Sequence, residues 1–309
     1  MFLAADGLDW LALGNVLDRS ADLRRQLSGE GFLLFRRLLP VAVVQELRAA
    51  VIGVIGREGW LAAGSDPDER QAGSAIVREG DHRWWSAYKA VQSLESFHRL
   101  AHEPRLLAII AALLDGPILV HPRKIARVTF PGSDYPTPPH QDFPLIQGTP
   151  DVLTVWVPLA GCGEEDGALR VLRQSAEQGL RARRSEHGVG GVGVRVLPEE
   201  AGRWVAPDYE MGDALVFHSL TVHWAPPNLG HRLRLSCDYR YQRLADPVTE
   251  ASLRPHYSPK LGDWDALTEG WSTTRWVDPP AAPTIAEMSP PMDEMELGPV
   301  TAVRLASSS

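Results

Sequence analysis

The sequence predicts a mainly β domain with flanking helices, in which the strands form an antiparallel sandwich or barrel. From Ile118 onward, short β-type runs follow one another and are separated by turn signals such as PGSD, GEEDG and PPNLG. No helical pattern lies between most of these runs, which favours antiparallel pairing. The preceding third of the chain is mainly helical. The 309 residues are 44% hydrophobic and 23% charged, an ordinary globular composition that excludes disorder of the whole chain.

The helical part is expected to cover residues 1–117 and to contain one short strand. Ser20 is a plausible N-cap, and glycines at 29 and 31 should end that helix. Phe32–Phe35 reads as a buried strand. Pro40 should begin a helix that continues with apolar residues at helical spacing, and Pro104 should break a helical stretch over 94–114.

The predicted β core covers residues 118–245. Its expected strands are residues 118–121, 125–130, 139–143, 152–158, 168–172, 214–218, 221–224 and 233–241. Residues 176–208 interrupt this pattern with a glycine-rich, locally basic stretch. We expect a long loop there that covers one end of the barrel, since loops of this length in a domain usually serve function.

The C-terminal part is expected to complete a single domain over residues 1–278. Trp264, Trp271 and Trp276 should anchor the segment 246–278 to the core by packing. Residues 279–309 are rich in proline and end in three serines, so we expect a poorly packed, partly disordered tail.

Charge and cysteine content exclude several classes of protein. Lys and Arg number 31 and Asp and Glu 39, so the formal charge is −8 and there is no bulk attraction to nucleic acid or to an anionic membrane. Two cysteines, Cys162 and Cys237, exclude a disulfide framework, a cysteine-rich zinc site and a cysteine-ligated iron–sulfur cluster. The longest apolar run, 106–114, is too short to span a bilayer, and the N-terminus has no basic start. We therefore expect a cytoplasmic protein, a monomer or homodimer, that acts on a small molecule.

The chemistry is predicted by His140 and Asp142. Among ten histidines, only His140 begins an H-x-D or H-x-E pattern, and side chains two apart on a strand share a face. His223 lies on another predicted strand. Two histidines and one carboxylate form the facial triad of non-heme Fe(II) enzymes, which leaves three metal positions for a bidentate co-substrate and dioxygen. Zinc hydrolases use similar ligands, so the triad alone leaves the metal open. His218 is the alternative second histidine.

A candidate anion clamp follows eleven residues after His223. A strand that buries Leu233 and Leu235 on one face directs Arg234 to the other face, which could be the barrel interior. A guanidinium that points inward needs a carboxylate and can bind one with two hydrogen bonds. A dicarboxylic co-substrate such as 2-oxoglutarate would supply it. Arg232 is the fallback clamp.

Three motifs in order resemble the phytanoyl-CoA dioxygenase-like family of Fe(II)/2-oxoglutarate-dependent oxygenases. They are TPPHQDFP, TVWVPLAGCGEEDGALRVL and MGDALVFHSLTVHWAPPNLGHRLRLSCDYRYQ. The segments GEGFLLFRRLLPVAVVQELRAAV and LAHEPRLLAIIAALLDGPILVHP are similar to the family's N-terminal helices, so the resemblance covers roughly residues 20–245. The sequence as a whole resembles bacterial natural-product hydroxylases of this family.

The resemblance implies a double-stranded β-helix (jelly-roll, cupin-like) core. It implies His140, Asp142 and His223 as catalytic iron ligands, with Arg234 binding the distal carboxylate of 2-oxoglutarate. The implied reaction uses Fe(II), 2-oxoglutarate and O2 to oxidise a C–H bond, with release of succinate and CO2. Because Asp142 is present, the vacant chloride site of halogenating relatives is not expected.

The sequence departs from the family after GALRVL, where residues 173–176 lack the frequent Gly-Ser-His. This departure bears on the substrate more than on iron. Lys124, Gln141 and Trp156 are further candidates for the co-substrate site. Arg127, on the same predicted strand as Lys124, is the alternative to it, and both could instead be solvated charges at the sheet edge. Gln141 should point to the opposite face of its strand, and Trp156 could instead pack in the core. Two other readings stay open: a non-catalytic jelly-roll binding protein, and a zinc- or nickel-dependent cupin-like hydrolase or isomerase.

Overall fold

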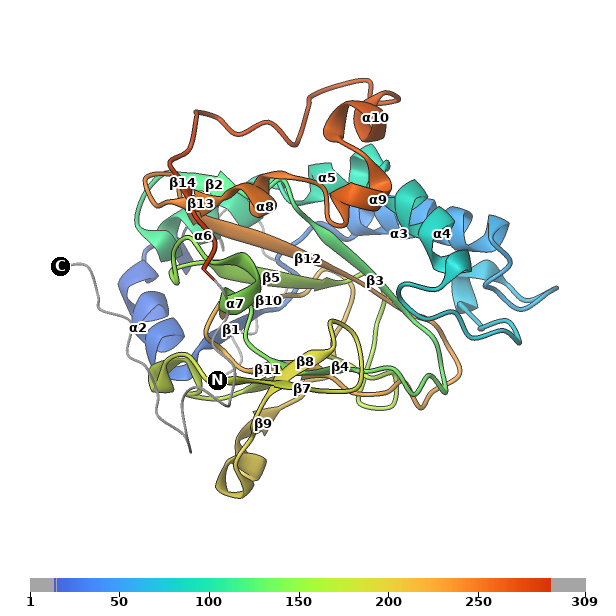
Figure 1. Cartoon of the computed structure of the whole chain (residues 1–309), viewed down its shortest axis with the longest axis horizontal. Helices are drawn as coiled ribbons and strands as arrows, with labels where there is room; N and C mark the ends of the chain where they lie inside the picture. Colours follow the sequence, from blue (N-terminus) through green and yellow to red (C-terminus); the bar gives the residue numbers. More distant parts are fainter. Residues whose placement is uncertain (1–13, 15, 290–309) are drawn as a thin grey trace.

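Two antiparallel sheets face each other, and helices cover the outer face of the larger sheet (Figure 1). The structure is a computed structural model, and it describes Gly14 and residues 16–289. Most of the helices come from the N-terminal part of the chain, and both sheets take nearly all their strands from the middle. This arrangement agrees with the predicted mainly β fold with flanking helices.

In the part of the chain that the structure describes, five α-helices precede the β core and pack around one another and on the larger sheet. They are α2 (Ser20–Glu30), α3 (Val41–Arg57), α4 (His82–Gln92), α5 (Glu95–Leu100) and α6 (Pro104–Leu114). The expected break at Pro104 is present, because α5 ends at Leu100 and Pro104 opens α6. The predicted N-cap at Ser20 was wrong, because Ser20 is already the first residue of α2. The N-cap position is occupied by Arg19, whose side chain makes no capping hydrogen bond. Gly31 ends α2 with a φ of 86°, which favours glycine.

The major sheet has the order β1-β10-β5-β12-β2, and β3 also pairs with β12. These strands are β1 (Phe32–Phe35), β2 (Ile118–Val120), β3 (Ile125–Thr129), β5 (Leu153–Pro158), β10 (Ala214–His218) and β12 (Arg234–Arg243). Every pairing is antiparallel. Strand β1 comes from the helical part of the chain, so the sheet extends beyond the predicted core of 118–245.

The minor sheet has the order β4-β11-β6-β9. Its strands are β4 (Thr137–His140), β6 (Arg170–Leu172), β9 (Trp204–Val205) and β11 (His223–Ala225). The predicted strand over 139–143 was wrong at its end, because β4 stops at His140 and the short helix α7 (Phe143–Ile146) follows. The predicted loop 176–208 is partly regular: it contributes β9 and a hairpin of β7 (Arg183–Ser185) and β8 (Val192–Val194).

The major sheet separates two apolar clusters. On its outer face, residues such as Val155, Val216 and Tyr239 pack against the helices. On its inner face, between the sheets, a smaller cluster contains Trp156 and Phe217. Strand alternation explains this division, since neighbouring residues on one strand point to opposite faces. The larger share of the apolar packing therefore lies outside the barrel, and the interior retains room for polar side chains.

The C-terminal segment folds back over the helical side of the molecule (Figure 1). It contains β13 (Val248–Thr249), α8 (Glu250–Leu253), α9 (Ser258–Leu261), α10 (Trp264–Thr268) and β14 (Ile285–Ala286). The Trp271 indole donates to the carbonyl of Ser93, and the Trp276 indole donates to Glu95, which fixes this segment to the helices.

The proline-rich tail is ordered in the part that the structure describes. Strand β14 pairs in parallel with β13, and the backbone of Ser289 exchanges hydrogen bonds with Gln147. The remainder of the predicted tail, 290–309, lies outside the described residues. Within the described ranges, no helix is both long and apolar enough to cross a membrane.

Candidate active site

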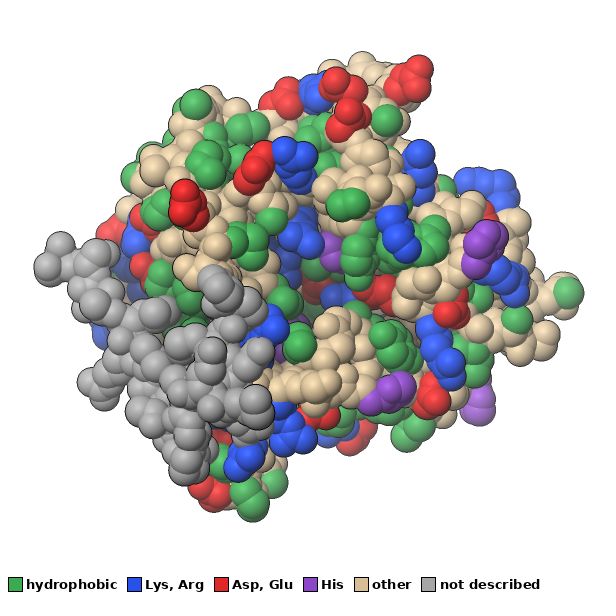
Figure 2. Space-filling model, in the orientation of Figure 1, with side chains coloured by type: hydrophobic (Ala, Val, Ile, Leu, Met, Phe, Trp, Pro, Cys, Tyr) green, Lys and Arg blue, Asp and Glu red, His purple; other side chains and the backbone are tan. Residues whose placement is uncertain are grey.

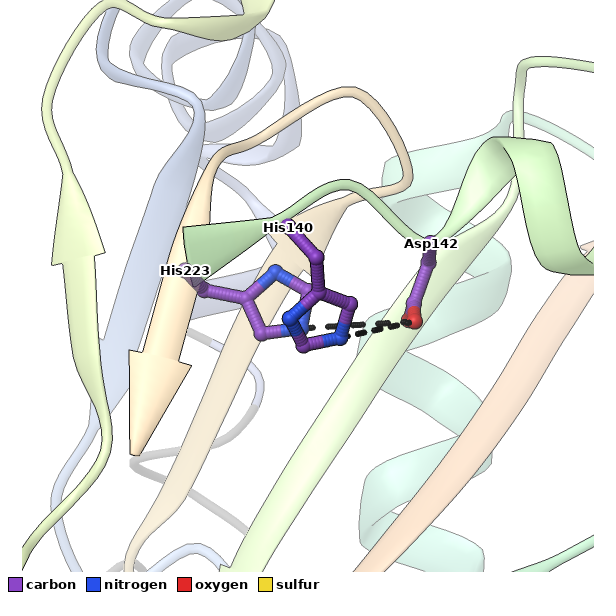
Figure 3. A group of neighbouring side chains, drawn as sticks. All are labelled: His140, Asp142 and His223. Atoms are coloured by element: carbon purple, nitrogen blue, oxygen red, sulfur yellow. Dashed lines mark ion pairs between the residues drawn. The ribbon is translucent and has the colours of Figure 1, made fainter. Parts of the chain in front are cut away.

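His140, Asp142 and His223 converge between the two sheets (Figure 3). The Nε2 atoms of His140 and His223 lie 3.9 and 4.0 Å from Oδ1 of Asp142, and the two imidazole centroids are 4.1 Å apart. One ligand atom from each residue lies within 4.8 Å of the others. Two imidazole nitrogens and a carboxylate oxygen at this spacing could hold one divalent metal ion on a shared face.

Strand pairing and a backbone turn bring the three side chains together. His140 on β4 and His223 on β11 are direct partners in the antiparallel register, so their side chains lie side by side. Asp142 is not on the strand: its φ and ψ of −72° and −33° are helical, and it caps α7. The expectation that His140 and Asp142 share a strand face was therefore wrong in its reason. The turn after β4 aims the carboxylate at the imidazoles.

Backbone carbonyls orient both histidines. The Nδ1 atom of His140 lies 2.8 Å from the carbonyl oxygen of Pro138, and that of His223 lies 3.0 Å from the carbonyl of Thr221. A neutral imidazole that donates from Nδ1 leaves the lone pair of Nε2 free. Both Nε2 atoms face Asp142, so each imidazole presents its metal-binding atom to the same point.

The electrostatics of the site keep the metal ligands in their binding forms. Burial, followed by the charge of His223, lowers the pKa of His140 to about 3, and burial also lowers the pKa of His223. Burial alone would raise the pKa of Asp142, but Arg240 and the two histidines hold it well below its usual range. At neutral pH the imidazoles are neutral and the carboxylate is ionised, as metal coordination requires.

Two residues that the sequence did not single out hold the carboxylate of Asp142. Arg240 donates to both of its oxygens, from Nη2 to Oδ1 at 2.9 Å and from Nε to Oδ2 at 3.2 Å. Thr154 donates to Oδ2 at 2.6 Å. Both donors lie inside the barrel on the major sheet, where they are partners across β12 and β5.

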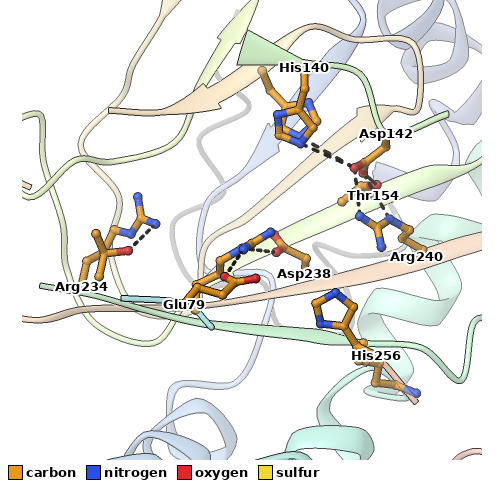
Figure 4. A network of polar contacts seen from close by, with 12 residues as sticks. Glu79, His140, Asp142, Thr154, Arg234, Asp238, Arg240 and His256 are labelled. Carbon is orange, nitrogen blue, oxygen red and sulfur yellow. Dashed lines mark hydrogen bonds and ion pairs between the residues drawn. The ribbon is translucent and has the colours of Figure 1, made fainter. Parts of the chain in front are cut away.

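Arg234 points into the barrel, as predicted, at the other end of the polar groups in Figure 4. It is 2% exposed, and its guanidinium donates to the carbonyl of Gly167 and to Oγ1 of Thr129. Its buried Nε has no hydrogen-bond partner, and neither has the buried Oγ of Ser236, two residues along the same strand face. No described carboxylate forms an ion pair with Arg234. Two orphaned buried donors fit the distal carboxylate of a dicarboxylic acid.

Charged and apolar side chains together line the cavity between the triad and Arg234. The major sheet contributes Arg127, Arg234, Asp238 and Arg240 from β3 and β12, and also Trp156 from β5, which is the cross-strand partner of Asp238. Leu169 and, on β11 of the minor sheet, Ala225 complete the lining. The space-filling view shows a hollow near the middle of this face, with charged side chains in its depth (Figure 2).

An ion-pair network connects the charged residues beside the cavity. Arg127 bonds to Glu79 at 2.6 Å and lies 3.6 Å from Asp238, and the hydroxyl of Tyr257 donates to Glu79 at 2.7 Å (Figure 4). Glu79 therefore ties β3 to the C-terminal segment beside the cavity.

The structure places the three further candidates differently. Trp156 lines the cavity and packs on Tyr209 with ring centroids 4.6 Å apart. Gln141 points away, as its strand position suggested, and its amide donates to the carbonyls of Gly179 and Leu220. Lys124 does not line the cavity either: its Nζ donates to the carbonyls of His121 and Pro122.

Strand alternation explains why Lys124 lies outside the cavity. On β3, Arg127 and Thr129 face the cavity, whereas Ala126 and Val128 face the helices. Lys124 shares the parity of Ala126, so it belongs to the helical side, where burial lowers its pKa to about 7. Of the two basic residues considered on this strand, Arg127 and not Lys124 lies inside the barrel.

The two alternative residues lie outside the site. The Nε2 atom of His218 is 3.6 Å from Asp151 and lines a different cavity, beside α2 and α6. Arg232 is half exposed and 3.8 Å from Asp166. The geometry thus favours His223 over His218 and Arg234 over Arg232.

Similarity to known proteins identifies the family of this chain. The family model of phytanoyl-CoA dioxygenase matches residues 27–236, which is more than half of the chain. The chain belongs to the phytanoyl-CoA dioxygenase family. It is accordingly an Fe(II)- and 2-oxoglutarate-dependent oxygenase, and the predicted enzyme class and cofactors are confirmed.

Solved structures share the fold at low sequence identity. The epimerase SnoN in complex with Fe3+, alpha ketoglutarate and nogalamycin RO has a TM-score of 0.57 and 20% identity, over 90% of this chain and 98% of that one. EctD from S. alaskensis with bound Fe has a TM-score of 0.55 and 17% identity, over 86% of each chain. At this identity the likeness establishes the jelly-roll fold of the family and no more. No curated protein matches the chain significantly.

Proposed function

We propose that this member of the phytanoyl-CoA dioxygenase family hydroxylates, or otherwise oxidises, an unactivated C–H bond of a small metabolite in natural-product biosynthesis. The supporting observation is that three side chains able to bind one metal ion share a cavity with Arg234, a buried arginine that pairs with no described carboxylate. A metal site alone fits several chemistries. A metal site that faces an unsatisfied guanidinium across one cavity fits a dicarboxylic co-substrate.

In this proposal, His140, Asp142 and His223 hold Fe(II), and Arg234 and Ser236 bind the distal carboxylate of 2-oxoglutarate. When bound, iron and 2-oxoglutarate supply the oxidising chemistry, with release of succinate and CO2. The chain supplies the rest. Carbonyls fix the two imidazoles, and Arg240 with Thr154 fixes the carboxylate of Asp142.

The mixed lining of the cavity suits a substrate with a carbon skeleton and a few polar groups. Trp156 and Leu169 offer apolar contact, and the charged side chains beside them can orient polar groups of the substrate. Two fold relatives support a role in natural products, since SnoN is an epimerase and SnoK a carbocyclase from nogalamycin biosynthesis. Their different reactions also leave room for an outcome other than hydroxylation.

Succinate release tests this function. The purified chain with Fe(II), 2-oxoglutarate and O2 is incubated with metabolites of the pathway encoded by the neighbouring genes, and succinate is measured by mass spectrometry. We expect one metabolite to stimulate succinate formation, and Asp142→Ala to abolish it while the variant keeps its thermal transition. Turnover under nitrogen without 2-oxoglutarate would instead support a hydrolase or isomerase. Metabolite binding without any succinate would support a binding protein.

A further inference from the structure

The two oxygens of Asp142 have different surroundings. Oδ1 faces both imidazoles, at 3.9 and 4.0 Å from their Nε2 atoms. Oδ2 accepts hydrogen bonds from Thr154 at 2.6 Å and from Nε of Arg240 at 3.2 Å. Oδ1 is therefore the oxygen presented to a metal, and both donors to Oδ2 come from the wall of the major sheet.

The fold holds the two donors to the Asp142 carboxylate in fixed positions. Arg240 and Thr154 are cross-strand partners on β12 and β5, and they are 6% and 1% exposed. Among the described residues, Asp142 is the one carboxylate that pairs with Arg240. A guanidinium donates two parallel hydrogen bonds in a fixed plane, so it sets the orientation of the carboxylate as well as its charge (Figure 4).

That orientation decides how many metal positions Asp142 takes. A carboxylate can bind a cation through one oxygen or through both. Three single-atom ligands leave three positions on a six-coordinate ion, which is what a bidentate 2-oxo acid and dioxygen together need. A chelating Asp142 would occupy one of these positions. Oδ1 can accept from Nη2 of Arg240 and still bind metal, because each oxygen has two lone pairs.

We propose that Arg240 is a positioning residue that restricts Asp142 to one-oxygen ligation of iron and so preserves the third open position. This inference rests on the proposed function, because it concerns the same metal site. It assigns to Arg240 a task that Arg234 does not have: Arg234 acts on the co-substrate, whereas Arg240 acts on a metal ligand.

Cobalt(II) as a probe metal tests the proposal in the full chain. The measurements are the visible absorption spectrum of the Co(II) protein and the calorimetric Kd of 2-oxoglutarate for it. In Arg240→Leu we expect one Co(II) still to bind, with an altered spectrum, and the Kd of 2-oxoglutarate to rise about tenfold, the size typical for loss of a residue that orients a metal ligand. Arg240→Lys should recover only part of the affinity, since an ammonium lacks the planar fork.

Arg243→Gln is the matched control. Arg243 lies on the same strand but is 41% exposed and pairs with Asp151 and Asp246, so its variant should match the wild type in spectrum and Kd. An unchanged spectrum and Kd in Arg240→Leu, or full recovery by Arg240→Lys, would overturn the proposal.

Thr154→Val decides the matter if Arg240→Leu does not fold. It removes the other donor to Oδ2, so we expect a higher Kd and a shifted spectrum, and wild-type values for both would again overturn the proposal. A wild-type Co(II) protein that binds no 2-oxoglutarate would instead contradict the proposed function, which keeps the two failures distinguishable.

Discussion

Replacement of Arg234 by leucine should separate the affinity of the enzyme for 2-oxoglutarate from its stability. The guanidinium is buried beside Thr129 and Gly167, and no described carboxylate neutralises it. Loss of one partner of a buried charge pair costs about 2–5 kcal/mol in binding. The Kd of 2-oxoglutarate should therefore rise by about 30-fold or more in Arg234→Leu.

The stability of the ligand-free protein should change in the opposite sense. A buried charge without a counter-ion destabilises the folded state, so Arg234→Leu should melt at the same temperature as the wild type or higher. Added 2-oxoglutarate should raise the melting temperature of the wild type by ligand linkage and leave that of the variant almost unchanged.

The assay compares 2-oxoglutarate with 2-oxobutanoate, which lacks the distal carboxylate. In calorimetric titrations of the Co(II) protein, the wild type should prefer 2-oxoglutarate strongly, and Arg234→Leu should bind the two acids about equally. Arg232→Gln is the control, because Arg232 is two residues away but half exposed. If Arg234→Leu kept the preference for 2-oxoglutarate, the assignment of the clamp would be refuted.

Three further predictions follow from the surroundings of single residues. The pKa of Lys124 is about 7 in the folded protein, below its usual 10.5, so the folded state binds fewer protons between these values and stability should rise with pH there. Urea denaturation at pH 6.5 and 9.5 should show Lys124→Met losing about 3 kcal/mol of that rise; an equal rise in both proteins would contradict the lowered pKa. Gly167→Ala should destabilise the protein by more than about 1 kcal/mol, because Gly167 has a φ of 72° and a Cβ would lie 2.5 Å from the carbonyl of Pro226. It should also weaken 2-oxoglutarate binding, since the carbonyl of Gly167 accepts from Arg234, and normal melting with normal affinity would argue against both effects. Because the pKa of His140 is about 3, Co(II) affinity should stay flat from pH 8 to pH 6; a steep fall near pH 6.5 would show that an ordinary histidine titrates.

The alternation along β12 shows how much of the site the sequence could predict. Leu235, Cys237, Tyr239 and Tyr241 face the helices, and the residues between them face the cavity. The prediction applied this rule to Arg234 and placed it on the face that lines the cavity. The same rule, applied to every second residue after Arg234, also places Asp238 and Arg240 on the cavity face. The prediction missed both residues.

Other features could not be read from local pattern. His140 and Asp142 were paired by a strand rule, yet Asp142 lies in a helical turn whose direction depends on contacts with Thr154 and Arg240, distant in sequence. Periodicity also could not tell that Lys124 lies on the helical side, because the register of β3 against β12 sets which parity faces inward. The 2-residue strand β9 is short enough that no periodic signal marks it.

The division of apolar packing across the major sheet has a consequence for how this enzyme could change. The outer cluster unites the helices with one face of the strands and contains most of the buried apolar side chains of the described residues, whereas the lining around the His140, Asp142 and His223 triad belongs to the other face. Substitutions in that lining remove few of the contacts that hold the scaffold together. Such a chain can therefore exchange one substrate for another while the architecture persists.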